Sequence, residues 1–280
     1  MAGISYLRFV ALGDSQTEGL GDGDDVVGLR GWADRLAEHL AAHSPDLRYA
    51  NLAVRGKRAA QVRADQLTPA LALRPDVATV VAGVNDVLRP RFDADEVATH
   101  LEAMFAALTA QGARVATLTF PTRMQAPARP LSSRVVALNQ RIREAAGRHD
   151  VAVAEGAHHA VITDPRLWSP DRLHASPLGH QRIAAAVAHA LALPGSDDSW
   201  TRALEPVPRA ALGGPRRVAD ELRWAAAFLG PWLARRMRGR SSGDGRTAKR
   251  PQLLPVSPPF SGHPAEQPTA GGVSPSAPRD

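Results

Sequence analysis

The stretch from Val10 to Gly19, which reads VALGDSQTEG, decides the fold of this chain. The apolar run Leu7–Leu12 ends abruptly in Gly-Asp-Ser, which predicts a buried strand that delivers Ser15 to a tight turn at its carboxyl end. Ligands bind at this edge of open α/β sheets, so a hydroxyl group there lies where chemistry takes place. The alternative is that Asp14 or Ser15 only caps the next helix.

Apolar runs alternate with helical patterns over the first two thirds of the chain. The five runs are Leu7–Leu12, Leu47–Leu52, Val77–Ala82, Ala113–Phe120 and Val151–Ala154. Helical spacing predicts helices over Gly31–His43, Ala59–Leu73, Asp95–Gln111, Leu131–His149 and Pro177–Leu193. This alternation predicts an α/β fold: a three-layer sandwich in which a five-stranded parallel sheet carries helices on both faces.

Composition limits the class of protein. With 280 residues and 44% hydrophobic residues, the chain is long enough for one α/β domain with extensions. The absence of cysteine excludes disulfides, thiolate nucleophiles and cysteine-based zinc sites. No apolar run approaches the ~18 residues of a transmembrane helix, and the amino terminus lacks the basic region of a signal peptide. We therefore expect a cytoplasmic protein.

The net charge of +6 is unevenly distributed. Residues 1–195 contain 21 basic and 20 acidic residues, whereas residues 196–280 contain 13 basic and 8 acidic ones. The part that carries the motifs is thus nearly neutral. Because a nucleic-acid-binding domain presents a basic face, we expect no nucleic-acid partner.

The changes in composition predict three parts. Residues 1–195 are expected to form the catalytic domain, residues 196–240 a basic helical extension, and residues 241–280 a disordered tail rich in proline, serine and glycine. Within the extension, residues 216–240 set apolar side chains against seven arginines. This helix either docks on the catalytic domain or makes a peripheral contact with a membrane or a partner.

Three further motifs follow Gly13-Asp14-Ser15, each after an apolar run or in a late loop. They are Gly56, the block Gly83-Val84-Asn85-Asp86, and the pair Asp171 and His174. Each is weak alone. In this order they resemble the SGNH hydrolases, which are the GDSL-type esterases and lipases, and the resemblance covers about residues 7–193.

The residue types fit acyl transfer. A serine hydroxyl becomes a good nucleophile when a base takes its proton, and the imidazole of His174 is the candidate base for Ser15. Asp171, three residues earlier, can orient the imidazole and stabilise its charged form. The other candidate histidines lack an aspartate at this spacing: His158, His159 and His180, of which His180 is expected to be a packed or surface residue.

The resemblance implies a flavodoxin-like fold and an oxyanion hole. Its donors would be the backbone N–H groups of Ser15 and Gly56 and the side-chain amide of Asn85. Glycine permits close approach of the backbone, and a neutral amide donates without adding charge. The remaining motif residues would support the turns: Gly13, Asp14, Gly83 and Asp86.

The function implied is a serine esterase or acylhydrolase that cleaves a small-molecule ester through an acyl-enzyme, without a metal or an organic cofactor. Two alternatives stay open: a lysophospholipase at a membrane surface, and a binding protein that keeps the fold without turnover. The loop Gly19–Arg30 contains three aspartates but lacks the full calcium pattern, so we expect a solvated mobile loop. Phe120–Leu131 is expected to form a rim loop near the site.

Overall fold

A single sheet of six strands forms the centre of the part of the chain that the computed structural model describes, namely residues 5–122, 131–206, 222–231 and 241–256. The strand order is β7-β6-β5-β1-β4-β8. The strands are β1 (Arg8–Gly13), β4 (Arg48–Asn51), β5 (Val77–Val81), β6 (Arg114–Leu118), β7 (Ala152–Ala154) and β8 (Arg250–Pro255). All neighbours pair in parallel except β4 and β8.

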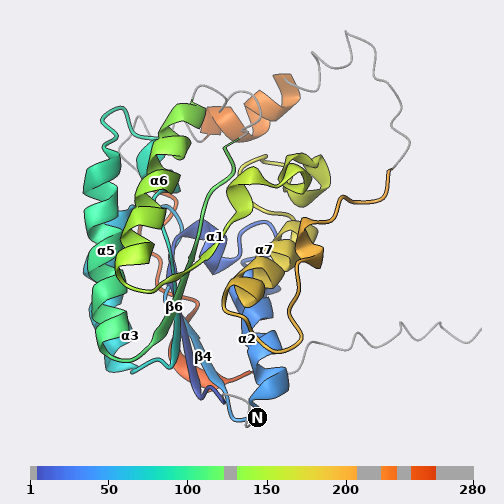
Figure 1. The fold of residues 1–280 in the computed structure, drawn as a ribbon. Helices are drawn as coiled ribbons and strands as arrows, with labels where there is room; N and C mark the ends of the chain where they lie inside the picture. Colours follow the sequence, from blue (N-terminus) through green and yellow to red (C-terminus); the bar gives the residue numbers. More distant parts are fainter. Residues whose placement is uncertain (1–4, 123–130, 207–221, 232–240, 257–280) are drawn as a thin grey trace, which may run out of the picture.

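Helices cover both faces of the sheet, as predicted (Figure 1). One face carries α3 (Ala59–Ala72), α5 (Ala94–Ala110) and α6 (Ser132–Arg148), and the other carries α2 (Trp32–His43) and α7 (Pro177–Ala190). Two short helices, α1 (Ser15–Glu18) and α4 (Val84–Val87), begin just past the carboxyl ends of β1 and β5. The three-layer α/β prediction is confirmed.

The central strands β1 and β5 are largely apolar because both of their faces are covered; Arg8 at the start of β1 and Thr79 in β5 are the exceptions. In β1, Phe9, Val10 and Leu12 are fully buried, and every residue of β5 is buried. Polar residues then mark where the helices begin. The Ser176 hydroxyl accepts the backbone N–H of Gly179 at the start of α7, as expected of an N-cap.

The sixth strand, β8, differs from the prediction of five strands. It is formed by residues 250–255 of the tail expected to be disordered over residues 241–280, of which residues 257–280 lie outside the described residues. It pairs antiparallel with the outer edge of β4, with Tyr49 opposite Leu254. The Arg250 guanidinium donates to the Tyr49 carbonyl at 2.8 Å and lies over the Tyr49 ring. Prolines argued against a strand here, but an edge strand needs ladder donors on one side only and therefore tolerates Pro251 and Pro255.

The helical extension over residues 216–240 is described only from residue 222 to residue 231. There the Arg172 guanidinium lies 4.8 Å from the centre of the Trp224 ring, while Leu222 and Phe228 are exposed. The extension thus touches the loop that carries Asp171. Docking and membrane contact both stay predictions for the whole segment.

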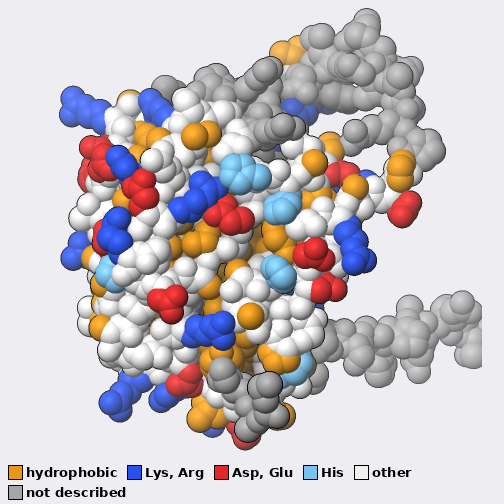
Figure 2. Space-filling model, in the orientation of Figure 1, with side chains coloured by type: hydrophobic (Ala, Val, Ile, Leu, Met, Phe, Trp, Pro, Cys, Tyr) orange, Lys and Arg blue, Asp and Glu red, His pale blue; other side chains and the backbone are white. Residues whose placement is uncertain are grey.

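The surface shown in Figure 2 carries acidic and basic side chains side by side. None of the helices in the described ranges combines the length and the apolar character needed to cross a membrane.

Candidate active site

The turn that carries Ser15 is built by close backbone packing. A Cβ at Gly13 would overlap the Thr17 hydroxyl and come within 2.6 Å of the Val81 carbonyl oxygen, so only glycine fits at this position. The buried Gln66 side chain on α3 accepts the Gly13 N–H at 2.8 Å and donates to the Gly13 carbonyl at 2.9 Å. These two hydrogen bonds hold the end of β1 just before Ser15.

Ser15, His174 and Asp171 come together although 159 residues separate the first two. The Ser15 hydroxyl lies 2.9 Å from His174 Nε2, and His174 Nδ1 lies 2.6 Å from Asp171 Oδ2. A carboxylate only accepts hydrogen bonds, so Nδ1 carries the ring proton and Nε2 is free to accept the serine proton. This is the arrangement of a serine triad.

Asp171 is fixed by hydrogen bonds at both oxygens. Its Oδ1 accepts the Ser169 hydroxyl at 2.6 Å and the backbone N–H groups of Leu173 and His174 at 2.9 and 3.0 Å. Burial alone would raise the pKa of Asp171, but the hydrogen bond and the charge of His174 outweigh it and hold this pKa well below its usual range. Asp171 therefore stays ionised beside the imidazole.

The three predicted oxyanion donors differ in their availability. Within the described part of the chain, the backbone N–H groups of Ser15 and Gly56 have no acceptor, and Gly56 has a φ of +76°, which favours glycine. The Asn85 amide nitrogen donates to Asp14 Oδ2 at 3.1 Å and to the Lys57 carbonyl at 3.0 Å. Both of its hydrogens are thus engaged, and donation to a substrate requires that one of them be released.

The two aspartates that are predicted to support the turns, Asp14 and Asp86, both accept backbone N–H groups. Asp14 accepts the Gln16 N–H and the Asn85 amide N–H. Burial raises the pKa of Asp14 to about 7. Burial likewise raises the pKa of Asp86, whose Oδ2 accepts the Ala59 N–H at 3.0 Å and so joins α4 to the start of α3. The fourth supporting residue, Gly83, has a φ of +121° and packs against Leu138.

Several supporting residues were missed by reasoning from the sequence. Gln66 is one, and Gln16 is another: its amide donates to the Leu173 carbonyl at 3.0 Å and accepts the Ala175 N–H at 3.3 Å, which joins α1 to the loop of His174. Arg55 binds Glu18 through its guanidinium and its backbone N–H. No local pattern marks these residues, because each acts on a partner distant in the sequence.

The competing histidines are engaged elsewhere. His158 lies 3.1 Å from an Arg143 nitrogen, and His159 packs edge-on against Trp200. His180 is fully buried: its Nδ1 accepts the Trp32 N–H at 3.1 Å, so Nε2 carries the proton donated to the Leu20 carbonyl at 2.9 Å. Burial lowers the pKa of His180 to about 4.

His180 makes the fold sensitive to acid. Between pH 6.5 and pH 4, His180 binds a proton in the unfolded chain but stays neutral in the native protein. The free energy of unfolding therefore falls as the pH drops through this window. At about 1.4 kcal/mol per pKa unit, the loss is on the order of 3 kcal/mol. Urea unfolding at pH 7 and pH 4.5 measures it. The variant His180→Gln should show a smaller difference between the two pH values, and an equal difference would contradict the assignment.

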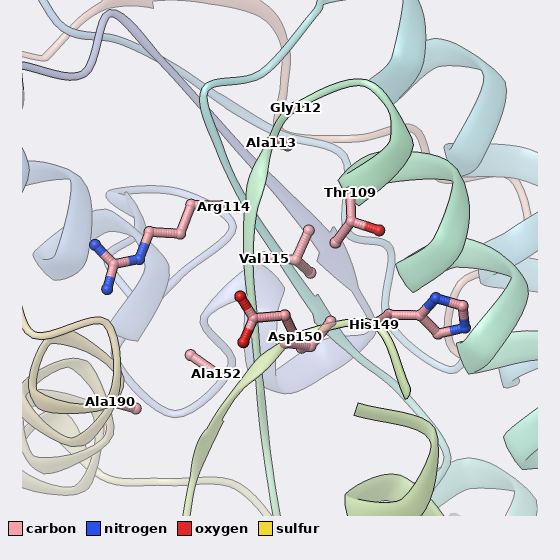
Figure 3. A pocket seen from close by; sticks show the side chains of 10 residues that line it. Thr109, Gly112, Ala113, Arg114, Val115, His149, Asp150, Ala152 and Ala190 are labelled. Atoms are coloured by element: carbon pink, nitrogen blue, oxygen red, sulfur yellow. The ribbon is translucent and has the colours of Figure 1, made fainter. Parts of the chain in front are cut away.

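A cavity of about 490 Å³ lies at the amino-terminal ends of β6 and β7, at the end of the sheet opposite to Ser15 (Figure 3). Figure 3 shows the Arg114, His149 and Asp150 side chains around it. The Thr109 hydroxyl donates to the Phe105 carbonyl, and His149 lies beside Glu102, so these groups do not form a pair of nucleophile and base.

An apolar cavity of about 100 Å³ lies between the sheet and α7. Gln16 and Ala175, the neighbours of Ser15 and His174, form part of its wall. The other lining residues are largely apolar and include Val81, Leu118, Phe120, Ile162, Trp168 and Ile183. Residues 123–130 of the expected rim loop lie outside the described residues.

The three aspartates of the loop Gly19–Arg30 all have partners within the chain, two of them outside the loop. Asp22 pairs with Arg35, and Asp25 pairs with Arg55 and Arg246. Asp24 accepts the Val26 and Val27 N–H groups in the hairpin of β2 (Gly23–Asp24) and β3 (Gly28–Leu29). In the described ranges, no group of three or more acidic or histidine side chains is arranged to hold a metal.

Solved structures share this fold. LAE5, an α/β hydrolase enzyme from the metagenome of Lake Arreo, Spain, is 24% identical with a TM-score of 0.57, over 70% of this chain and 99% of that one. TesA is also 24% identical, with a TM-score of 0.56 over 66% and 97% of the two chains. Axe2, an acetylxylan esterase from Geobacillus stearothermophilus, is 18% identical with a TM-score of 0.56, over 70% and 98%.

No curated protein matches the chain. A family model matches residues 11–182, which run from the strand before Ser15 through His174 into α7. That range spans the Ser15 turn, Gly56, Asn85 and the loop of Asp171 and His174. By its fold and by this match, the chain belongs to the GDSL-like lipase/acylhydrolase family.

Proposed function

We propose that this protein is a serine esterase that cleaves carboxylic esters of small molecules through an acyl-enzyme. The proposal is carried by the continuous hydrogen-bond chain from Ser15 through His174 to Asp171, with distances of 2.9 and 2.6 Å. Membership of the family supports ester hydrolysis as the reaction.

In the first step, Ser15 Oγ attacks the ester carbonyl carbon while His174 Nε2 takes the hydroxyl proton. The tetrahedral intermediate collapses, the C–O bond to the alcohol breaks, and His174 gives its proton to the departing alkoxide. Water then attacks the acyl-enzyme with the same base, releasing the carboxylic acid and restoring Ser15. Asp171 stabilises the imidazolium in both halves.

The oxyanion would be bound by the N–H groups of Ser15 and Gly56, joined by Asn85. The Asn85 amide binds the Asp14 carboxyl and the Lys57 carbonyl, so it lies between the nucleophile turn and the Gly56 loop. Asn85→Ala should lower kcat by about 10²–10³-fold, as for other single oxyanion donors. The comparison of kcat on one ester before and after the change measures it, and an unchanged kcat would remove Asn85 from the oxyanion hole.

The apolar cavity beside Gln16 and Ala175 would take the acyl group. An apolar cavity of 150 Å³ holds a benzene molecule, so about 100 Å³ suits an acyl chain of roughly four carbons or fewer. Turnover should therefore be highest on short-chain esters.

Purified wild type and Ser15→Ala, assayed on p-nitrophenyl esters from acetate to palmitate, test the proposal. Turnover that is lost in Ser15→Ala and highest on short chains is the expected result. If wild type neither turns over any ester nor reacts with a fluorophosphonate probe, the esterase assignment fails and the non-catalytic alternative replaces it.

A further inference from the structure

Residues 241–256, which we call the C-terminal strap, run beside the candidate active site and end as β8 on the edge of β4. They lie beyond the family match, which ends at residue 182. The matches to the similar structures cover 97–99% of those chains but only 66–70% of this one. The strap is therefore an addition to the family fold in this protein.

The strap packs closely against the loop of Gly56. A Cβ at Gly56 would overlap the Ser241 hydroxyl and come within 3.0 Å of the Ser242 hydroxyl. In return, a Cβ at Gly243 would overlap the Arg55 carbonyl oxygen. Each segment thus presents a glycine where the other approaches: Gly56 faces the Ser241 and Ser242 hydroxyls, and Gly243 packs directly on the Arg55 backbone.

The atom that Gly243 touches matters for the chemistry. The Arg55 carbonyl and the Gly56 N–H belong to one planar peptide unit and point in opposite directions from it. Steric contact between Gly243 and the Arg55 carbonyl oxygen therefore fixes the orientation of this peptide unit, and with it the direction of the Gly56 N–H group. That N–H has no acceptor within the described ranges and is one of the proposed oxyanion donors.

A chain of ion pairs ties the strap to the helix of the nucleophile. Glu18, at the end of α1, binds the Arg55 guanidinium at 2.6 and 2.9 Å, and the exposed fractions of these two side chains are only 7% and 11%. Arg55 shares Asp25 with Arg246 of the strap, at 2.9 and 2.7 Å. Lys249 adds a second anchor to Asp34 at 2.6 Å.

We propose that the strap is a positioning element of the active site: Gly243 and Ser241 hold the Arg55–Gly56 peptide so that its N–H faces the oxyanion. The inference rests on the proposed esterase function and gives residues outside the family match a part in the reaction. The strap binds no substrate in this scheme. It acts through Gly56.

The substitution Gly243→Ala in the full chain tests the proposal. The backbone of Gly243 lies outside the left-handed region, so alanine adds no strain and acts only as a wedge against Arg55. Since a displacement of about 1 Å near the chemistry costs up to about 10²-fold, we expect kcat to fall about 10- to 100-fold while KM stays within about twofold. Gly147→Ala is the matched control, because its Cβ meets nothing within 4 Å, and kcat should not change.

A second variant covers the case in which Gly243→Ala lowers the melting temperature. Arg246→Gln removes an anchor at a side chain that is 41% exposed, and should lower kcat more modestly, whereas Arg246→Lys should restore it. Hydrogen exchange at the Gly56 amide should accelerate in Gly243→Ala and in Arg246→Gln.

The outcomes separate the two proposals. If wild-type turnover does not depend on Ser15, the esterase assignment fails first. If it does, and folded Gly243→Ala and Arg246→Gln keep wild-type kcat and Gly56 exchange rates, the strap has no positioning role. A rise in kcat in either variant would overturn the proposal too, since the strap would then obstruct the site.

Discussion

Replacing Asp171 by Asn should lower kcat by about 10⁴-fold, the loss that a wrong histidine tautomer causes in serine triads. Three donors converge on Asp171 Oδ1: the Ser169 hydroxyl and the N–H groups of Leu173 and His174. In the variant this position must remain an oxygen, so the new NH₂ group faces His174 Nδ1. The ring proton then moves to Nε2, which no longer accepts from Ser15.

A comparison of kcat on a short p-nitrophenyl ester for wild type, Asp171→Asn and Ser169→Ala measures this effect. Ser169→Ala is the control, because it removes one of the three donors and leaves the carboxylate beside His174 intact. It should lose far less activity than Asp171→Asn. An Asp171→Asn enzyme with more than about a tenth of wild-type kcat would show that Asp171 does not set the tautomer.

Ser15→Ala and His174→Ala should each lower kcat by about 10⁶-fold, and the double variant should be little worse than either. The reason is that the 2.9 Å contact between Ser15 Oγ and His174 Nε2 joins the two residues into one functional unit. Without the imidazole the hydroxyl is not activated, and without the hydroxyl the imidazole has no proton to accept. Steady-state kinetics of the three variants on one ester give the comparison.

His158→Ala serves as the control for the loss of a histidine, because His158 lies beside Arg143 rather than in the triad. Its kcat should match that of wild type. Additive losses in the Ser15 and His174 double variant would mean that the two residues act independently, which contradicts the mechanism.

The residues of the site could be found from the sequence because their neighbourhood is encoded locally. Strands β1, β4 and β5 each deliver one motif to the same edge of the sheet, and Asp171 and His174 lie three residues apart in one loop. The topology of a parallel sheet then brings Ser15 to His174 across 159 residues. The roles of these residues in catalysis stay predictions until they are measured.

The supports of the site could not be found in this way. Gln66 is a polar residue within α3, and nothing near it in the sequence indicates that its amide binds Gly13. Likewise, nothing in the sequence indicates that Arg55 binds Glu18. β8 was missed for another reason: two prolines in six residues argue against a strand unless its place at an edge is already known.

Strand β8 also has a consequence for the way the protein is made. Arg250 and its partner Tyr49 are 201 residues apart, so at about 5–20 residues per second the ribosome completes β4 about 10–40 s before it reaches β8. During that interval the outer edge of β4 offers unpaired backbone groups to any other strand nearby. Over nearly the same interval the Gly56 loop lacks the strap residues that pack against it. The nascent chain therefore passes through a stage in which Ser15, Asp171 and His174 have been synthesised while the sheet is still open at one side.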